Sequence, residues 1–371
     1  MPPTRPLFPA GQVPSCRLPA SCGRWLRVEG LIFFALLLVS LSAISAPQVL
    51  SPQAQTLVRQ GQAAVDAGDF ARAASDFEQA RQLAPENLEV NRGLLLSYLQ
   101  TGRLAEAVKI GRAAVARWPG DVLLQHWLGL AYFKSGQNAL ALETLKRAEK
   151  LDGARSDIHF DLALVLLAGS QYSPAADELE KVIKFKSSDT LAHVLLGRAY
   201  QNSNRTLQAI EQFQTALRLD RNTPLGHYHL GFAYASLGRN QEAIAEYEKE
   251  LVNAPENPEV LSHLGHCLVE TGKWRSAIVH LKRAAELDPQ NEDVFYDLGK
   301  AVLLDGDAES AILPLRRAVT LKPSDPSPHY QLARALKKMG KADEAQQEWQ
   351  RFAELKKAQP QTGGMATGRV Q

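Results

Sequence analysis

The sequence has little cysteine. Three cysteines occur in 371 residues, and two of them, Cys16 and Cys22, lie near the N-terminus, which leaves only Cys267 in the rest of the chain. One thiol can form neither an internal disulfide nor a cysteine-based zinc site. We therefore expect Cys267 to be a small buried apolar residue.

The chain also lacks a marked excess of charge of either sign. Its formal net charge is +2, and removing the four Arg and one Glu of residues 1–46 leaves 38 basic residues against 39 acidic ones. A near-neutral body provides no counterion-release drive toward nucleic acid. We therefore expect no nucleic-acid partner.

Motifs for catalysis are missing as well. The sequence contains no phosphate-binding loop, no nucleophile elbow and no dinucleotide-binding fingerprint. Nine histidines are present, but His159, His193, His227 and His329 recur at one spacing, and none of the nine lies in a cysteine or carboxylate cluster with metal-ligand spacing. Helix packing explains the recurrence of these histidines. Because the sequence has neither a catalytic motif nor a cluster of metal ligands, we expect no enzyme activity, no cofactor and no metal.

We interpret residues 1–46 as a leader that contains a signal peptide. An uncharged apolar core at 31–44 follows Arg24 and Arg27, and Ala43 and Ser45 fit a cleavage site after Ser45. The apolar run is somewhat short for a membrane span. Three interpretations stay open: a cleaved signal peptide, an uncleaved membrane anchor over 31–46, and a non-functional leader from a misplaced translation start.

The rest of the chain repeats itself every 34 residues. The repeat is marked by turn residues at one position, which is Gly in seven units, Ser170 in the fourth and Asn204 in the fifth. A linker at 47–53 precedes the repeats, and a Gly- and Thr-rich tail at 360–371 follows them and is expected to be disordered. The nine units, numbered repeats 1–9, cover 54–87, 88–121, 122–155, 156–189, 190–223, 224–257, 258–291, 292–325 and 326–359.

Residue types are constrained at a few of the 34 positions. Position 20 is Ala in every unit, position 7 is Leu and position 8 is small in eight, and position 32 is Pro in five. Position 27 is Ala in most units, with Val182 and Glu250 among the exceptions. Repeat 2 departs at two positions, with Leu95 at position 8 and Gly111 at position 24. This exchange of sizes suggests compensation.

These constraints resemble the tetratricopeptide repeat (TPR) family. Its signature has Leu-Gly at positions 7–8, an aromatic near 11, Ala at 20, a bulky residue at 24, Ala at 27 and Pro at 32. Repeat 6 matches well, with Leu230-Gly231, Tyr234, Ala243, Tyr247 and Pro255. The resemblance covers 54–359 and implies an all-α, right-handed superhelical solenoid of nine helix-turn-helix repeats.

Physical chemistry supports the same architecture. Apolar side chains at 7 and 11 share one helix face, small residues at 8 and 20 allow close helix packing, and Pro at 32 ends the second helix. Gly or Asn at position 15 can adopt the left-handed conformation that ends helix A. Pro314 should kink the second helix of repeat 8. The polar last helix should cap the solenoid against water.

The resemblance also places a groove along the first helices, at positions 2, 5, 9, 12 and 13. We expect it to be apolar and aromatic in the middle and basic at its C-terminal end, where it could anchor an acidic segment or a carboxylate. The alternative is that the aromatics pack between repeats and the cations form a solvated face. The candidate groove residues are Leu130, Phe133, Phe160, Leu164, Tyr228, Phe232, Tyr296, Lys300, Tyr330, Arg334, Lys337 and Lys338.

The leading functional hypothesis is therefore an exported or envelope-associated scaffold, periplasmic or secreted, that binds other proteins or peptides through this groove. A membrane contact is expected only if the leader stays as an anchor. Two alternatives remain: a structural solenoid that assembles with itself, and a groove that binds carbohydrate or another small molecule. The repeat fixes the scaffold and leaves the partner undetermined.

Overall fold

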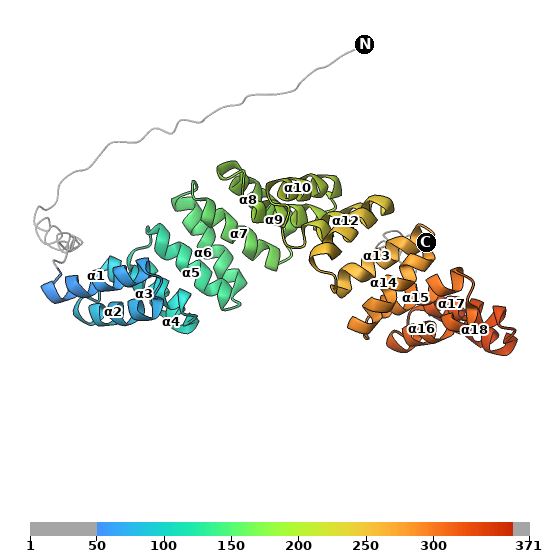
Figure 1. Cartoon of the computed structure of the whole chain (residues 1–371). Coiled ribbons are helices and arrows are strands. Elements are labelled where there is room, and N and C mark those ends of the chain that lie inside the picture. The colour runs from blue at the N-terminus through green and yellow to red at the C-terminus, as the bar shows by residue number, and fades with distance from the viewer. Residues whose placement is uncertain (1–49, 359–371) are drawn as a thin grey trace, which may run out of the picture. The chain divides into compact units, whose positions relative to one another are not determined.

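The computed structural model describes residues 50–358 (Figure 1). The expected leader at 1–46, the alternative anchor at 31–46, and the tail at 360–371 lie outside the described residues. Within the described part, Leu50 onward forms one compact unit. No helix in this part is both long enough and apolar enough to span a bilayer.

The described residues form 18 helices and no strand, which confirms the all-α solenoid. Each repeat contributes a helix A and a helix B. The A helices are α1 (Pro52–Asp66), α3 (Leu88–Gln100), α5 (Val122–Lys134), α7 (Ser156–Ala168), α9 (Thr190–Asn202), α11 (Gly226–Ser236), α13 (Pro258–Glu270), α15 (Glu292–Leu304) and α17 (Pro326–Lys338). The B helices are α2 (Phe70–Leu83), α4 (Leu104–Arg117), α6 (Asn138–Leu151), α8 (Tyr172–Phe185), α10 (Thr206–Leu219), α12 (Asn240–Asn253), α14 (Trp274–Leu287), α16 (Ala308–Leu321) and α18 (Ala342–Ala358).

The ends of the A helices follow from local chemistry. The last residue of six repeats is Asp or Asn, and its side chain accepts a hydrogen bond from the first turn of the next A helix, as Asp121 does from the Leu124 amide at 2.9 Å. The first helix, α1, begins inside the expected linker because Ser51 caps it and Pro52 suits the first helical position.

The A helices end in a left-handed residue, as the sequence predicts. The seven turn glycines all have positive φ, and so do Ser170 at 55° and Asn204 at 61°. In α16, the helix continues past Pro314 to Leu321. The kink at Pro314 stays a prediction.

Replacing Ser170 with Gly should stabilise the protein. A side chain in the left-handed region costs about 1–2 kcal/mol, which glycine avoids, so we expect Ser170→Gly to raise the free energy of unfolding by about 1 kcal/mol. Ala168→Gly, in the last helical turn just before it, should instead lower that energy by about 0.5–1 kcal/mol. Urea unfolding followed by circular dichroism measures both, and a loss of stability in Ser170→Gly would contradict the argument.

Position 24 of helix B fills the core of each repeat. Its side chain packs where position 8 of helix A has no room for one: a Cβ at Gly197 would lie 2.5 Å from the Phe213 ring, and one at Gly265 would lie 2.4 Å from Leu281. Repeat 2 shows the expected exchange. Leu95 is fully buried there and lies beside Gly111.

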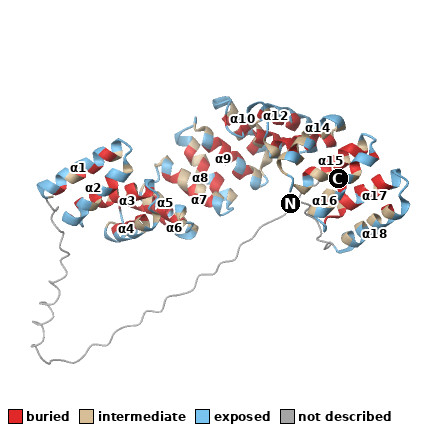
Figure 2. Cartoon of the chain, turned by 60° about the horizontal axis from the view of Figure 1, so that its bottom comes forward, coloured by how far each residue is buried: buried red, intermediate tan, exposed pale blue. Residues whose placement is uncertain are grey.

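Neighbouring repeats pack in a regular order. Each B helix contacts the A helix before it, and each from α2 to α16 also contacts the A helix after it; nearly all successive A helices contact one another as well. The A helices therefore lie on the closer-packed side of the solenoid. Buried residues lie on the sides of the helices that pack against other helices (Figure 2). In α18 only Ala345 is buried, which is consistent with the expected role of this helix as a polar cap.

Candidate protein-binding groove

The A-helix face carries the twelve residues predicted to line the groove. The structure leaves four of them exposed: Phe232, Tyr330, Lys337 and Lys338. Tyr228 is buried, and the other seven are partly buried. Leu130, Phe133, Phe160 and Leu164 pack against the core. Part of the set thus serves packing between repeats, as the alternative interpretation proposed.

The middle of the groove contains a cluster of rings from repeats 6 and 7. The Tyr228 ring lies 5.7 Å from His263 and 6.3 Å from Phe232, while Tyr247 stacks on His263 at 6.0 Å. Phe232 is 39% exposed, against 8% for Tyr228. Phe232 is therefore the ring of this cluster that a partner can contact.

Tyr228 is a supporting residue and not the surface ring that the sequence suggested. Its hydroxyl donates to Glu259 Oε1 at 2.7 Å. Burial, followed by this hydrogen bond to a carboxylate, raises the pKa of Tyr228 well above its usual value. The correction follows from geometry, because position 5 of this helix faces the next repeat as well as the groove.

Glu250 explains one exception in the repeat pattern. The residue before α11 is Leu225, which lies in the left-handed region at φ 57° and offers no capping side chain. Buried Glu250, on α12, accepts a hydrogen bond from the Tyr228 amide at 3.1 Å and so replaces the missing cap. An acid at position 27 thus holds the first turn of the helix that carries Phe232.

Two histidines join neighbouring repeats by stacking. His229 stacks on Phe213 at 5.5 Å with the planes 16° apart, and His263 stacks on Tyr247 in the same way one repeat later. Burial lowers the pKa of His229 to about 4. The ring is therefore neutral at physiological pH and acts as an aromatic spacer between the repeats.

The expected basic end of the groove begins at Lys300, which is already paired. Its ammonium donates to Glu270 Oε1 at 2.8 Å, across the boundary between repeats 7 and 8. Burial opposes the charged form, but the bond to Glu270 outweighs it and the pKa of Lys300 is raised. Lys300 is therefore a bridge between repeats, and the prediction of a free cation at this place is corrected.

The remaining cations of this end are also partly engaged. Arg334 donates to Gln331 at 2.9 Å, and the ammonium of Lys337 lies 5.3 Å from the centre of the Trp349 ring. Lys338 is exposed. The C-terminal end of the groove therefore carries less free positive charge than the sequence suggests, because Arg334 donates to a side-chain amide and Lys337 lies over an aromatic ring.

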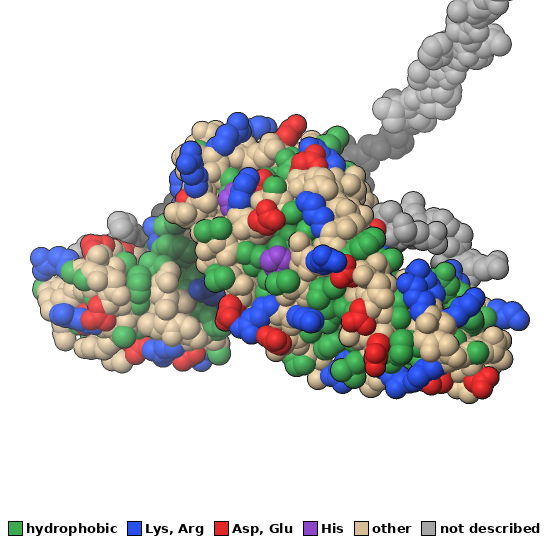
Figure 3. Space-filling view, turned by 45° about the vertical axis from the view of Figure 1, so that its right-hand side comes forward, with side chains coloured by type: hydrophobic (Ala, Val, Ile, Leu, Met, Phe, Trp, Pro, Cys, Tyr) green, Lys and Arg blue, Asp and Glu red, His purple; other side chains and the backbone are tan. Residues whose placement is uncertain are grey.

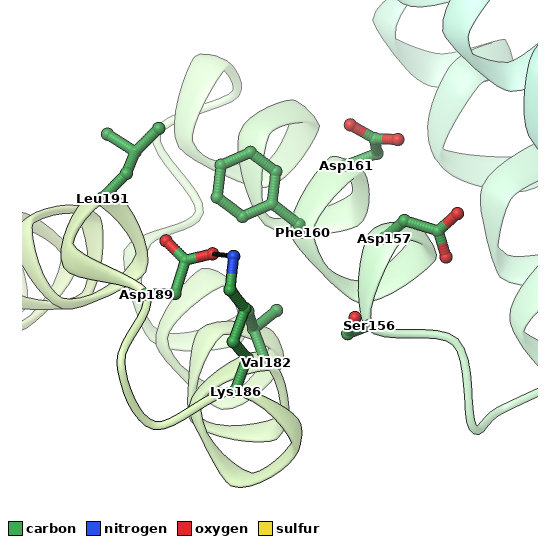
Figure 4. A pocket seen from close by; sticks show the side chains of 8 residues that line it. All are labelled: Ser156, Asp157, Phe160, Asp161, Val182, Lys186, Asp189 and Leu191. Atoms are coloured by element: carbon green, nitrogen blue, oxygen red, sulfur yellow. Dashed lines mark hydrogen bonds and ion pairs between the residues drawn. The ribbon is translucent and has the colours of Figure 1, made fainter.

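A hollow of about 280 Å³ opens between α7 and α9 (Figure 4). Of the successive A helices, α7 and α9 approach each other least closely. Phe160 is the one predicted groove residue in this hollow, and the carboxylates of Asp157 and Asp161, which flank it on α7, were not predicted. The lining residues are Ser156, Asp157, Phe160, Asp161, Val182, Lys186, Asp189 and Leu191.

Surface chemistry elsewhere is mixed. On the face shown in Figure 3, hydrophobic side chains reach the surface in small patches between acidic and basic ones. Several exposed aliphatic residues, including Leu207, Val279 and Leu313, lie on B helices. The exposed apolar residues Leu191, Phe232 and Tyr330 lie on A helices in three different repeats.

The recurring histidines have structural partners. His159, His193, His227 and His329 each bond through Nδ1 to the residue at position 23 of their own helix B, at 2.6–2.7 Å. One of them, His159, lies with Glu149 and Glu178 in a group close enough to ligate a metal. The ammonium of Lys181 bonds to both glutamates, at 2.8 and 2.9 Å, so an internal cation already occupies the space between them.

Comparison with known proteins identifies the same repeat architecture. A tetratricopeptide repeat model matches residues 58–122, 128–190 and 194–258, and a TPR repeat model matches 265–306. No curated protein matches the chain. Among solved structures, the C-terminal part of a TPR repeat-containing protein from Cytophaga hutchinsonii is 19% identical, with 65% of this chain and 99% of that chain covered at a TM-score of 0.54.

Two other solved structures show shorter matches. MamA from Desulfovibrio magneticus RS-1 is 22% identical over 46% of this chain and 97% of that chain, with a TM-score of 0.44. YrrB, described as a TPR protein with an unusual peptide-binding site, is 21% identical over 50% of this chain and 96% of that chain, with a TM-score of 0.45. Likeness at these identities concerns the fold alone. The family models match more than half of the sequence, and the chain belongs to the tetratricopeptide repeat family.

Proposed function

We propose that the protein is an exported scaffold that holds an extended segment of a partner protein along its A-helix face. TPR repeats are generally non-catalytic, and such arrays act by presenting surfaces. The observation that carries the proposal is the exposure of large apolar residues, Leu191, Phe232 and Tyr330, on A helices of separate repeats. Exposed rings beside polar groups are typical of residues that anchor a bound segment.

The support beneath Phe232 strengthens this proposal. The Phe232 ring lies 5.3 Å from the His263 ring and 6.3 Å from the Tyr228 ring. His263 belongs to the next repeat, and the Tyr228 hydroxyl is held by its hydrogen bond to Glu259. A contact ring whose neighbours are fixed loses little conformational entropy on binding. Export rests on the leader at 1–46, whose basic residues, apolar core and small residues fit a signal peptide.

Site-specific photo-crosslinking tests both parts of the proposal. Benzoylphenylalanine in place of Phe232 should crosslink a partner in living cells, whereas the same group at Leu207, which is 66% exposed on B helix α10, should not crosslink that partner. The crosslinked product should be recovered from the envelope or the medium, and its N-terminal sequence should begin after Ser45. Identical products at both positions would reject the groove, and a mature chain that begins upstream of Leu31 would reject the signal peptide.

A further inference from the structure

Arg198 is the one exposed residue in a stretch of α9 that is otherwise buried. From Ala192 to Tyr200, every other residue of this helix is buried. Within residues 50–358 the guanidinium of Arg198 forms no hydrogen bond and no ion pair. Glu259, an acid on the A-helix face of repeat 7, accepts its hydrogen bond from the Tyr228 hydroxyl and not from Arg198. Arg198 therefore brings an unmatched positive charge to the middle of the groove.

Other cations at comparable places of the groove are engaged. Four of them share positions 5, 9 and 12 of the A helices with Arg198, and these are Arg92, Lys300, Arg334 and Lys337. Arg92 and Lys300 pair with acids, whereas Arg334 donates to an amide. Lys337 lies over an aromatic ring. At these positions of the described helices, Arg198 is thus the cation whose side chain has neither a hydrogen-bond partner nor a ring.

Exposed apolar side chains accompany Arg198 at the matching repeat positions. Leu191, on the same helix, is 56% exposed, and Leu225 and Phe232 of the next repeat are 41% and 39% exposed. Both leucines occupy position 2, and Arg198 and Phe232 occupy position 9, on or directly before the two contacting helices α9 and α11. Seven residues separate these positions, which is about 10 Å along a helix. The surface thus combines a pair of leucines with a cation and a ring about 10 Å away.

Leu225 has an unfavourable backbone conformation. Its φ is 57°, in the left-handed region that side chains with a Cβ rarely adopt and that glycine adopts freely. It also offers no side-chain cap to α11, a task that Glu250 performs instead. Strained residues are concentrated where binding or catalysis uses them. The strain at Leu225 is therefore a second, independent sign that this part of the groove contacts a partner.

We propose that Arg198 binds an acidic side chain within the partner segment, and that a large apolar residue three positions from this acid contacts Leu191 and Leu225. A carboxylate brings only acceptors and a negative charge, which matches an unpaired guanidinium. An extended chain advances about 3.3 Å per residue, so three residues span the distance between positions 2 and 9. This inference rests on the proposed function and adds a charge and a spacing to the partner's sequence.

Paired peptides test the inference on the full wild-type chain. The first probe is a nine-residue peptide of Ala and Ser with a central Glu and a Leu three residues to either side, and the second has Gln in place of the Glu. Caps at both ends remove the terminal charges, so only the side chain supplies a carboxylate. Fluorescence anisotropy at low salt should show the Glu peptide binding about three- to fivefold more tightly, as expected for one partly exposed ion pair. The difference should vanish at about 1 M salt.

Matched variants locate the charge effect. Arg198→Gln should make the two affinities equal, and Arg198→Glu should reverse the preference in favour of the Gln peptide. Arg112→Gln is the control for net charge, because Arg112 is an exposed cation on B helix α4, and this variant should keep the preference for Glu. Both arginines are exposed, so these substitutions should leave the fold intact. The comparison of the two peptides on the wild-type chain depends on no variant.

Leu225→Gly tests the apolar part of the site. Glycine suits the left-handed backbone, so this variant should unfold at a higher urea concentration than the wild type. It should also bind both peptides about threefold more weakly, because an apolar contact is lost, while it keeps the preference for Glu. A variant that is more stable and binds both peptides like the wild type would overturn the contact at Leu225.

The possible outcomes separate this inference from the proposed function. Equal affinity of the two peptides for the wild-type chain would overturn the acid site and leave a peptide-binding groove standing. Absence of binding by either peptide would overturn the acid site as well, and so would a preference for Glu that survives in Arg198→Gln. The groove itself would fall only if crosslinks at Phe232 were also missing.

Discussion

Phe213→Ala is expected to lower the free energy of unfolding by about 3–5 kcal/mol, the range for removing a fully buried aromatic side chain. The ring is fully buried, and a Cβ on Gly197 of α9 would lie 2.5 Å from it. On its other side it stacks on His229 of α11 at 5.5 Å. The ring therefore joins repeats 5 and 6 in addition to filling repeat 5, so its loss weakens both.

The same substitution should split the unfolding transition. In a repeat array, each unit contacts only its neighbours, so a weakened boundary uncouples the two sides. Urea unfolding can be followed by circular dichroism and by tryptophan fluorescence, since Trp118 and Trp127 lie before repeat 5 and Trp274 and Trp349 lie after it. We expect the unfolding curve of Phe213→Ala to show two transitions and that of the wild type to show one. A single transition that shifts as a whole would show that the boundary is not where coupling is concentrated.

The control for this experiment is Trp349→Ala. Trp349 occupies the same repeat position in the last unit, where no further repeat packs against it, and it is only partly buried. Its removal should cost about 1–2 kcal/mol and should not create a second transition. The comparison keeps the repeat position constant and changes whether a following repeat packs against the ring.

The sequence alone predicted most of the scaffold because the scaffold depends on properties that repeat. A position that must have positive φ selects Gly or Asn, and the structure shows positive φ even at Ser170, where the residue type is less suited. The size exchange between Leu95 and Gly111 was also visible, since one position cannot grow unless its partner shrinks. These constraints act between fixed positions within one repeat, and they can be recognised in the sequence because the repeat occurs nine times.

The candidate site was harder to predict because it depends on where the repeats differ. The ammonium of Lys300 pairs with Glu270 of the preceding repeat, and this contact is visible only when the two neighbouring repeats are packed side by side in the structure. The hollow at Phe160 arises from the wider separation of α7 and α9, which no single repeat position encodes. Position lists along one helix thus overestimated the free charge at the C-terminal end and missed the carboxylates in the middle.

The exchange in repeat 2 leads to the second large expected effect. Leu95 is fully buried, and a Cβ at Gly111 would lie 3.3 Å from Leu95 Cδ1 and 2.9 Å from Leu128 Cδ1. Leu95→Gly should therefore open a cavity that Gly111 cannot fill, at a cost of about 3–5 kcal/mol from lost burial and about 1 kcal/mol more for glycine within a helix. Gly111→Leu alone should overpack the same space and cost about 1–3 kcal/mol, offset in part by better helix propensity.

The double variant Leu95→Gly, Gly111→Leu restores the arrangement of the other repeats, in which a glycine on helix A faces a large residue on helix B. Gly129 and Leu145 show that arrangement one repeat later, with a Cβ at Gly129 placed 2.6 Å from Leu145. We expect the double variant to lie within about 1.5 kcal/mol of the wild type, whereas the two single losses sum to at least about 4 kcal/mol, so that the two changes interact by at least about 2.5 kcal/mol. A double-mutant cycle from urea unfolding measures this coupling. Additive losses would mean that Leu95 packs against residues other than those around Gly111, and that the size exchange in repeat 2 is not compensation.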